Sequence, residues 1–305
     1  MPKKENVCGI IVTYNPNENC LFAIERNCST LAKVIIYDNS TINENIVLLS
    51  KLVNNLNRKF KDKKREVILI RGPQNIGLSR AYNHCASIAR GLGFTFILLL
   101  DQDSFFENSS FEILLEEYDH INALFPVGAI SPSYIQEGGR FYDFLYDGRF
   151  KWKDFYYSDH IIELRDLINS GMLISIRVFD SISGYDEGIF LDNSDLNFTL
   201  RLRLNGYRLF QSSNSKLIHN YGDKVPPKSK VNILYRAPDR DFFIKDLIGC
   251  LPIAWKISFV DLSLIILLLC AKIFSTLLLK DKKKQRFAYI VRGIRLSVLF
   301  DTFKR

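Results

Sequence analysis

The stretch Phe94-Thr95-Phe96-Ile97-Leu98-Leu99-Leu100-Asp101-Gln102-Asp103-Ser104 decides the fold class of this chain. Its first seven residues form a predominantly apolar run of strand length, and the run ends in four polar residues. A strand without polar alternation is buried on both faces, which is typical of a parallel sheet covered by helices. Ligands bind beyond the carboxyl ends of such strands in open α/β sheets, so the polar end predicts a site.

Three earlier stretches repeat this pattern of a short apolar run followed by a polar turn. The runs are Val7–Val12, Val34–Tyr37 and Val67–Ile70, and the turns are Thr13–Pro16, Asp38–Ser40 and Arg71–Pro73. Helices are expected in between and beyond, at residues 17–30, 43–61, 78–91 and 109–123. This alternation predicts an α/β fold with a mostly parallel central sheet flanked by helices.

The middle of the chain has a different character, because aromatic residues flank a turn signal. Asp147-Gly148 lies between Phe141–Tyr146 and Arg149–Trp152, which predicts a β-hairpin. These rings could stack on sugars or form the packed face of the hairpin. Further on, Asp195–Asn205 has helical spacing, and Gly206 stands where a helix C-cap is expected.

Charge separates the body of the chain from its C-terminal tail. The 305 residues carry a formal net charge of +8, and residues 280–305 hold nine Lys or Arg against two Asp, a net +7. A nucleic-acid-binding protein normally distributes its basic residues over the folded body, so nucleic acid is not an expected partner. The basic tail directly follows the most apolar stretch, Trp255–Leu279. This order favours contact with an anionic membrane surface.

The apolar stretch is long enough to span a bilayer, but Asp261 and Lys272 interrupt it. After it, Arg292 and Arg295 lie opposite an apolar helical face formed by Phe287, Ile290, Val291, Ile294 and Val298. Such a helix is typical of one that lies in the membrane interface. We therefore expect peripheral, monotopic association through residues 239–305. A spanning helix and an ordinary buried helix are the alternatives.

The six cysteines show no Cys-x-x-Cys pair and no regular spacing. They are expected to be small buried side chains in a reducing compartment and not a disulfide framework or a zinc site. No secretory signal is expected either, because the apolar run Val7–Val12 is too short.

Asp101 and Asp103 give the strongest local indication of chemistry. Mg²⁺ and Mn²⁺ prefer oxygen ligands and are often bound by one or two carboxylates plus substrate phosphates. At a strand end the chain turns, so one carboxylate could meet the cation and the other a ribose or the cation's water. The alternative is a solvated turn or a helix N-cap. Thr13, Asn15 and Asp38 end two other strands and could bind a base and ribose.

Several motifs, in this order and spacing, resemble the family 2 glycosyltransferases. They are Thr13–Pro16, Asp38–Ser40, Asn75–Asn83, Leu100–Ser104, Asn169–Gly171, Gly184–Glu187 and Phe190–Asn197, followed by Arg201 and Gly206-Tyr207. The Asp-Gln-Asp-Ser form is most similar to the bacterial rhamnosyltransferase branch. The resemblance covers roughly residues 7–221, and it is specific because the motifs are many.

The resemblance implies a GT-A type nucleotide-sugar-binding domain, inversion at the anomeric carbon, and Mg²⁺ or Mn²⁺ as cofactor. By analogy, the donor would be bound by Thr13, Tyr14, Asn15, Asp38, Asn75, Gly77, Leu78, Asn83, Asp101 and Gln102. The metal would be held by Asp103 and Asp101. His219 follows a strand-like run, and a histidine there can reach the metal or the pyrophosphate in related enzymes; a structural histidine is the alternative.

Asp195 matches the family's general base, near the N-terminus of a helix. The chain departs from the pattern at Ser194, where many members have Glu, and at Asn197, where an acidic residue is common. Asp192 is a rival base, because the rhamnosyltransferase branch has an aspartate there. The chemistry needs one carboxylate within hydrogen-bond reach of the acceptor hydroxyl. For either aspartate the alternative is a helix N-cap.

The chain is thus expected to hold a catalytic domain at 1–238, with a donor half at about 1–104 and an acceptor half at about 105–238. It would move L-rhamnose from dTDP-L-rhamnose to a polyprenyl-diphosphate-linked glycan in bacterial surface polysaccharide synthesis (O-antigen lipopolysaccharide, capsule or cell wall). This would happen at the cytoplasmic face of the inner membrane. A UDP-hexose or UDP-N-acetylhexosamine donor is the alternative, and a non-catalytic membrane-bound scaffold is the alternative of another class. A homodimer is compatible with the sequence.

Overall fold

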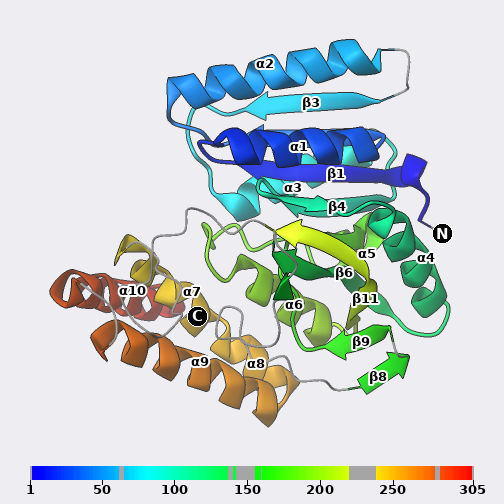
Figure 1. The fold of residues 1–305 in the computed structure, drawn as a ribbon. Coiled ribbons are helices and arrows are strands. Elements are labelled where there is room, and N and C mark those ends of the chain that lie inside the picture. The colour runs from blue at the N-terminus through cyan, green and yellow to red at the C-terminus, as the bar shows by residue number, and fades with distance from the viewer. Residues whose placement is uncertain are drawn as a thin grey trace.

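One mixed sheet runs through the body of the molecule (Figure 1). The computed structural model describes residues 2–61, 65–136, 140–141, 155–158, 160–219, 238–278 and 282–303. The strands follow one another across the sheet in the order β3 (Glu66–Arg71), β2 (Lys33–Asp38), β1 (Val7–Thr13), β4 (Phe96–Asp101), β10 (Met172–Ser175), β6 (Val127–Gln136), β11 (Arg208–His219), β9 (Ile161–Leu164) and β8 (Phe155–Ser158). Two short strands lie beside this path, β5 (Ser104–Phe106) against β11 and β7 (Arg140–Phe141) against β6.

The N-terminal half of the sheet is parallel and buried on both faces. Strands β1 to β4 pair in parallel over six residues each. The side chains of β1 alternate between two cores, with Val7 and Ile11 in one and Cys8 and Ile10 in the other. The helices of this half are α1 (Glu18–Thr30), α2 (Asn43–Phe60), α3 (Leu78–Gly91) and α4 (Ser110–Asn122), after the short 3-10 turn η1 (Lys4–Asn6). The strands, helices and parallel pairing expected here are confirmed.

The second half of the sheet mixes directions. Strand β10 runs antiparallel to both β4 and β6, whereas β6 and β11 run parallel. Since the longest ladders are parallel, the sheet is mostly parallel as expected. Two helices follow β10, α5 (Ile176–Ser181) and α6 (Ser194–Leu204). Helix α6 ends one residue earlier than expected, at an Asn205 C-cap, and Gly206 follows with φ of +83°. Most of the hairpin predicted around Asp147-Gly148 lies outside the described residues.

The C-terminal helices pack against α6 at one end of the molecule (Figure 1). They are η3 (Pro238–Phe243), a 3-10 turn, followed by α7 (Ile244–Gly249), α8 (Leu251–Ile257), α9 (Phe259–Leu278) and α10 (Lys283–Phe303). The expected apolar stretch is therefore broken at Ser258 between α8 and α9. Among the described residues, no helix combines the length and apolarity that a membrane crossing requires.

Buried ion pairs fasten these helices. Asp261 of α9, 3% exposed, pairs with Arg203 of α6 and with Arg165, whose Nη1 lies 3.2 Å from Asp261 Oδ2. Arg286 of α10 is fully buried and pairs at 3.0 Å with Oδ2 of Asp241 in η3. Two buried carboxylates thus connect α9 to α6 and Arg165, and α10 to η3.

The prediction that the apolar side chains of α10 form one lipid-facing surface is only partly correct. Ile290 is 2% exposed, and a Cβ at Gly293 would clash with the Phe242 carbonyl oxygen, so this side of α10 packs on protein. Phe287 and Ile294 remain exposed at 52% and 36%. The side chain of Val298 lies outside the described residues. The apolar side chains of α10 are therefore divided between a protein contact and the surface.

Five cysteines are buried thiols, as expected for small apolar side chains: Cys8, Cys20, Cys28, Cys85 and Cys250. Cys270 of α9 is exposed and departs from that expectation. Burial raises the pKa of the Cys8 and Cys28 thiols to about 12, which keeps both protonated and unreactive at neutral pH.

Candidate active site

The carboxyl ends of β1, β2 and β4 form the edge on which the site is built. The register pairs Thr13 with Asp38 and Val12 with Asp101, so the three strands end at one level. Thr13 Oγ1 donates a 2.9 Å hydrogen bond to Asp38 Oδ1, which also accepts the Ser40 N–H at 3.0 Å. These bonds hold the buried Asp38 carboxylate where the sequence predicts a nucleoside contact.

The turn after β1 is hydrogen-bonded to the ends of both neighbouring strands. The Tyr14 N–H donates to Gln102 Oε1 at 2.9 Å, and the Asn15 N–H donates to Ser40 Oγ at 2.8 Å. Asn15 has φ of 45°, a left-handed conformation that asparagine tolerates, and its Oδ1 accepts the Thr41 N–H at 2.9 Å. The Tyr14 side chain is half exposed at this edge, where an aromatic ring can stack on a base.

The predicted donor segment at the start of α3 is joined to the loop before α6. Gly77 has φ of +83°, and a Cβ at this position would lie 2.6 Å from the Phe190 carbonyl oxygen. The same oxygen accepts the Leu78 N–H at 2.7 Å, and Asn75 Oδ1 accepts the Gly77 N–H at 2.9 Å. Only glycine fits here, because both the left-handed conformation and the close approach exclude a side chain.

Asn83 holds a neighbouring loop. Its Oδ1 accepts the Tyr185 N–H at 2.8 Å, and its Nδ2 donates to the Tyr185 carbonyl at 2.9 Å and to Glu187 Oε1 at 3.1 Å. These contacts order residues 185–187. These contacts show that Asn83 supports that loop. The sequence predicts Asn83 as a contact of the nucleotide-sugar donor.

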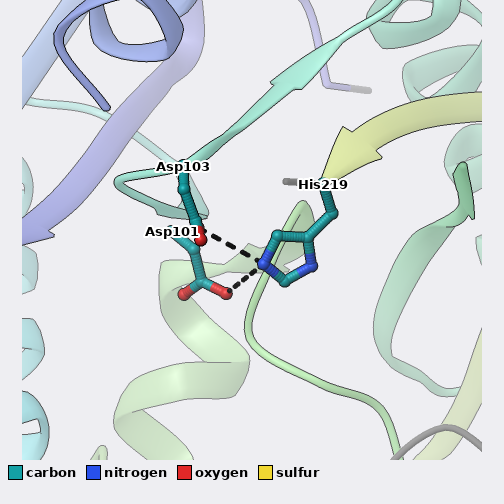
Figure 2. Close-up of side chains that lie close together, drawn as sticks. All are labelled: Asp101, Asp103 and His219. Atoms are coloured by element: carbon teal, nitrogen blue, oxygen red, sulfur yellow. Dashed lines mark ion pairs between the residues drawn. The ribbon is translucent and has the colours of Figure 1, made fainter. Parts of the chain in front are cut away.

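The side chains of Asp101, Asp103 and His219 lie close together at the carboxyl end of β4 (Figure 2). His219 is the last residue of β11 and pairs across the sheet with Ser104 of β5, only three residues beyond Asp101. Its Nε2 lies 3.5 Å from Asp101 Oδ2 and 3.3 Å from Asp103 Oδ1. The ring is 4% exposed. The antiparallel β5–β11 pair is thus what brings a distant histidine to the two aspartates.

This cluster fits a divalent cation. One ligand atom from each of the three residues lies within 4.8 Å of the others. Two carboxylates and an imidazole are a common ligand set for such ions. Burial, assisted by the negative charges of Asp103 and Asp195 and opposed by His219, raises the pKa of Asp101 to about 6. The site therefore concentrates negative charge that a cation would neutralise.

The two candidate bases face different surroundings. The pKa of Tyr185 is raised mainly by burial and, second, by the negative charge of Asp195. The charge of Asp195 also raises the pKa of Asp101, so Asp195 lies within electrostatic range of the cation cluster. Asp192 is buried at 8% exposure, and its charge acts on Asp246 of α7. Asp195 is also less buried than Asp192, so the two aspartates differ both in exposure and in the charged groups around them.

The segment that carries both aspartates, residues 190–195, is here called the catalytic loop. The ring of Phe190 stacks on Phe243 of η3, with centroids 6.4 Å apart and planes 6° apart. Asn193 has φ of 64°, and its Nδ2 donates to the Phe243 carbonyl at 3.3 Å. The catalytic loop thus lies between the start of α3 and the C-terminal helices.

Sequence reasoning missed Tyr134, which lies next to the cation cluster. Tyr134 of β6 donates from its hydroxyl to the Ser170 carbonyl at 3.0 Å, and its ring centroid lies 6.4 Å from that of His219. Ser170 Oγ is 2.7 Å from Ser104 Oγ, which joins the start of β10 to β5. Tyr134 has no local motif around it. Only the pairing of β6 with β11 shows its place.

The comparisons with known proteins agree with this geometry. The model of Glycosyl transferase family 2 matches residues 8–180. The chain belongs to this family. It is therefore a glycosyltransferase. A curated relative supports its similarity to the rhamnosyltransferase branch. The dTDP-rhamnosyl transferase RfbF of Shigella flexneri is 27% identical over 250 residues, which are 78% of this chain and 77% of that protein.

Solved structures share the fold of this glycosyltransferase. TarS 1–349 of S. aureus matches with a TM-score of 0.57 at 14% identity, over 96% of this chain and 81% of that one. The mannosyltransferase PcManGT of Pyrobaculum calidifontis, in complex with GDP-Man and Mn²⁺, matches with a TM-score of 0.57 at 12% identity, over 96% and 87%. At these identities the likeness establishes the GT-A type fold alone.

Proposed function

We propose that this family 2 glycosyltransferase moves L-rhamnose from dTDP-L-rhamnose to a hydroxyl of a lipid-linked glycan, with inversion at the anomeric carbon. The observation that carries the proposal is the convergence of Asp101, Asp103 and His219 at one edge of the sheet, within electrostatic range of Asp195. The dTDP-rhamnosyl transferase of Shigella flexneri supports the donor.

The chain's own residues divide the work between two sides of the site. On the donor side, Asp38 and the turn after β1 would hold the nucleoside, and Asp101, Asp103 and His219 would hold Mg²⁺ or Mn²⁺. A bound cation would stabilise the negative charge that develops on the departing diphosphate.

On the acceptor side, Asp195 would accept the proton of the attacking hydroxyl. The acceptor oxygen forms its bond to the anomeric carbon from the face opposite the leaving group. The bond from that carbon to the diphosphate then breaks, and dTDP leaves with both electrons. The products are the inverted glycoside, dTDP and a protonated Asp195.

The acceptor we propose is a polyprenyl-diphosphate-linked glycan of bacterial surface polysaccharide synthesis, at the cytoplasmic face of the inner membrane. Residues 1–238 would form the catalytic domain and residues 239–305 the membrane-associating region. The buried pairs that Asp261 makes with Arg165 and Arg203 join the two regions.

A screen of nucleotide-sugars for transfer tests the donor. We expect dTDP-L-rhamnose to be consumed faster than UDP-glucose, UDP-N-acetylglucosamine or GDP-mannose by the full chain with Mn²⁺. Preference for a UDP-sugar would replace the donor and leave the family unchanged. Consumption of none of them, with no acceptor glycosylated, would favour the non-catalytic scaffold.

Calorimetric titration of dTDP with and without Mn²⁺ tests the cation site. In the wild type we expect Mn²⁺ to strengthen dTDP binding. The Asp103→Asn variant, which removes one charge at nearly constant volume, should lose that enhancement and most transfer activity. Asp119→Asn on α4 is the matched control, and it should keep both. Unchanged Mn²⁺-dependent affinity in Asp103→Asn would exclude residue 103 as a ligand.

A further inference from the structure

Helix α9 has two faces, and one of them is apolar and exposed. Its inner face, with Ile265 at 3% exposure, packs against Leu196 and Leu200 of α6. Its outer face carries Phe259, Ile266, Leu267 and Phe274, which are 75%, 45%, 54% and 61% exposed, and Trp255 of α8 precedes them at 64%. We call these five residues the α9 outer face. In Figure 1, α9 lies along the border of the molecule, away from the sheet.

Exposed basic residues lie on the same group of C-terminal helices as this face. They lie before α9, at the start of α10 and further along α10: Lys256, Lys282, Lys283, Lys284, Arg292 and Arg295. By contrast, the acidic side chains described within residues 241–274 and 282–296 are all buried, at 1% for Asp241, 5% for Asp246 and 3% for Asp261. The described surface of the C-terminal helices is therefore apolar and positive, with no acidic side chain to offset the charge.

We propose that the α9 outer face and these basic residues bind an anionic lipid surface. A group of exposed apolar side chains on one helix face is typical of an interaction site. Tryptophan and phenylalanine suit the boundary between headgroups and acyl chains, and basic residues near them are attracted to anionic headgroups. In this proposal the helices lie along the membrane surface.

A lipid surface fits better than a second copy of the chain. In a symmetric dimer through this face, the same patch from each copy would meet itself. The basic residues of the two copies would then come together without described acidic partners, which is unfavourable. An anionic membrane supplies the opposite charge and an apolar interior together.

The position of this surface matters for catalysis, a consequence that rests on the proposed function. Helix α6, which begins with Ser194-Asp195, shares its apolar contacts with α8 and α9. The Phe190–Phe243 stack joins the catalytic loop to η3. A membrane held by α9 would therefore sit at a fixed distance from Asp195, as a lipid-linked acceptor requires.

Co-sedimentation of the full chain with vesicles tests the proposal. We expect binding to phosphatidylcholine vesicles that contain phosphatidylglycerol, weaker binding to phosphatidylcholine alone, and a decrease with salt. The triple variant Lys282→Gln, Lys283→Gln, Lys284→Gln should lower affinity for anionic vesicles at low salt by up to about a hundredfold. The double variant Phe259→Gln, Leu267→Gln should lose the binding that persists at high salt.

Matched variants on α2 and at its C-cap, Lys61, control for charge and apolarity. Lys51→Gln, Arg58→Gln, Lys61→Gln removes three exposed charges, and Val47→Gln, Leu48→Gln removes two exposed apolar side chains. Both should bind vesicles as the wild type does. Equal losses in the control and test variants would overturn the proposal, as would failure of the wild type to bind. A wild-type dimer in light scattering that becomes monomeric in Phe259→Gln, Leu267→Gln would assign the face to a second copy instead.

Vesicle binding and sugar transfer are measured separately. Transfer to a soluble acceptor analogue should survive in all four variants. Vesicle binding without any transfer by the wild type would overturn the proposed function alone. Transfer with no vesicle binding would overturn the lipid surface alone.

Discussion

The donor edge of the sheet and the catalytic loop are built in different ways. At the donor edge, Thr13, Asp38 and Asp101 end adjacent parallel strands, and the register alone brings them together. The catalytic loop is not part of any strand. Its position depends on Leu78 at one side and on Phe243 at the other. The comparison shows that residues 190–195 contact the C-terminal helices through Phe243, whereas Thr13, Asp38 and Asp101 are positioned by strand register.

The largest effect should come from the catalytic loop itself. Asp195→Asn removes the proposed base at constant size and should lower kcat by about a hundred- to ten-thousandfold, the usual range for general acid–base catalysis. Binding of dTDP, a property of the donor edge, should stay near the wild-type value. Steady-state kinetics and calorimetry measure the two.

Asp192→Asn is the matched variant, because it changes the same group three residues away. It should retain most of the turnover. An inactive Asp192→Asn with an active Asp195→Asn would reverse the assignment and would mean that the loop turns its other aspartate to the substrate.

The next effect concerns the attachment of α9. Burial acts to raise the pKa of Asp261, but hydrogen bonds from Arg203 and Ser258 and the charges of both arginines outweigh it, so the pKa lies below its ordinary value. Asp261→Asn would leave Arg165 and Arg203 without their shared carboxylate. Removal of one partner from a buried pair should lower the free energy of unfolding by about 3 kcal/mol.

Urea unfolding at neutral pH measures this loss. The exposed pair of Arg90 and Asp180, 2.7 Å apart, is the control, and Asp180→Asn should cost less than about 1 kcal/mol. Similar values for the two variants would mean that α9 is attached by its apolar contacts alone.

A pH-dependent effect should come from Asp246 of α7. Burial, the largest cause, raises its pKa to about 6, opposed by Lys245 and aided by Asp192. A raised carboxyl pKa means that the folded protein favours the protonated form, so stability from this group falls as pH rises from about 4 through 6. At pH 8 the penalty is roughly 2–3 kcal/mol, from about two units at 1.36 kcal/mol each.

Asp246→Asn should abolish this pH dependence. The difference in unfolding free energy between the variant and the wild type should shift in favour of the variant between pH 4.5 and pH 8, by up to roughly that amount. A difference that is constant across this range would mean that Lys245 keeps the carboxylate charged in the fold.

The smallest effect should come from the contact between the two regions. Phe243→Ala removes the ring that stacks on Phe190 and should lower kcat by up to about tenfold, since such pairs contribute about 0.5–1.5 kcal/mol. The KM for the donor should change little, because the donor edge is untouched. Phe243→Tyr keeps the ring and should restore turnover. Loss of donor affinity without loss of kcat would show that Phe243 acts on the donor side instead.

The sequence by itself determined the donor half. Burial on both faces requires continuous apolar runs, and polar residues must follow where those strands end. Local composition therefore located β1 to β4, their helices and the Asp101–Asp103 pair. Asp195 was located by resemblance, through a motif that is contiguous in the chain.

Only the tertiary structure decided how distant segments meet. His219 reaches Asp101 because β5 pairs with β11, and Asp192 and Asp195 differ because the fold buries Asp192 more deeply. Ile290, predicted for a lipid-facing surface, packs on protein because Gly293 lets α10 approach η3. Apolar residues at helical spacing indicate that a helix face is buried, but they do not indicate which partner covers that face. That partner is chosen by contacts between residues far apart in the chain, which no local pattern encodes.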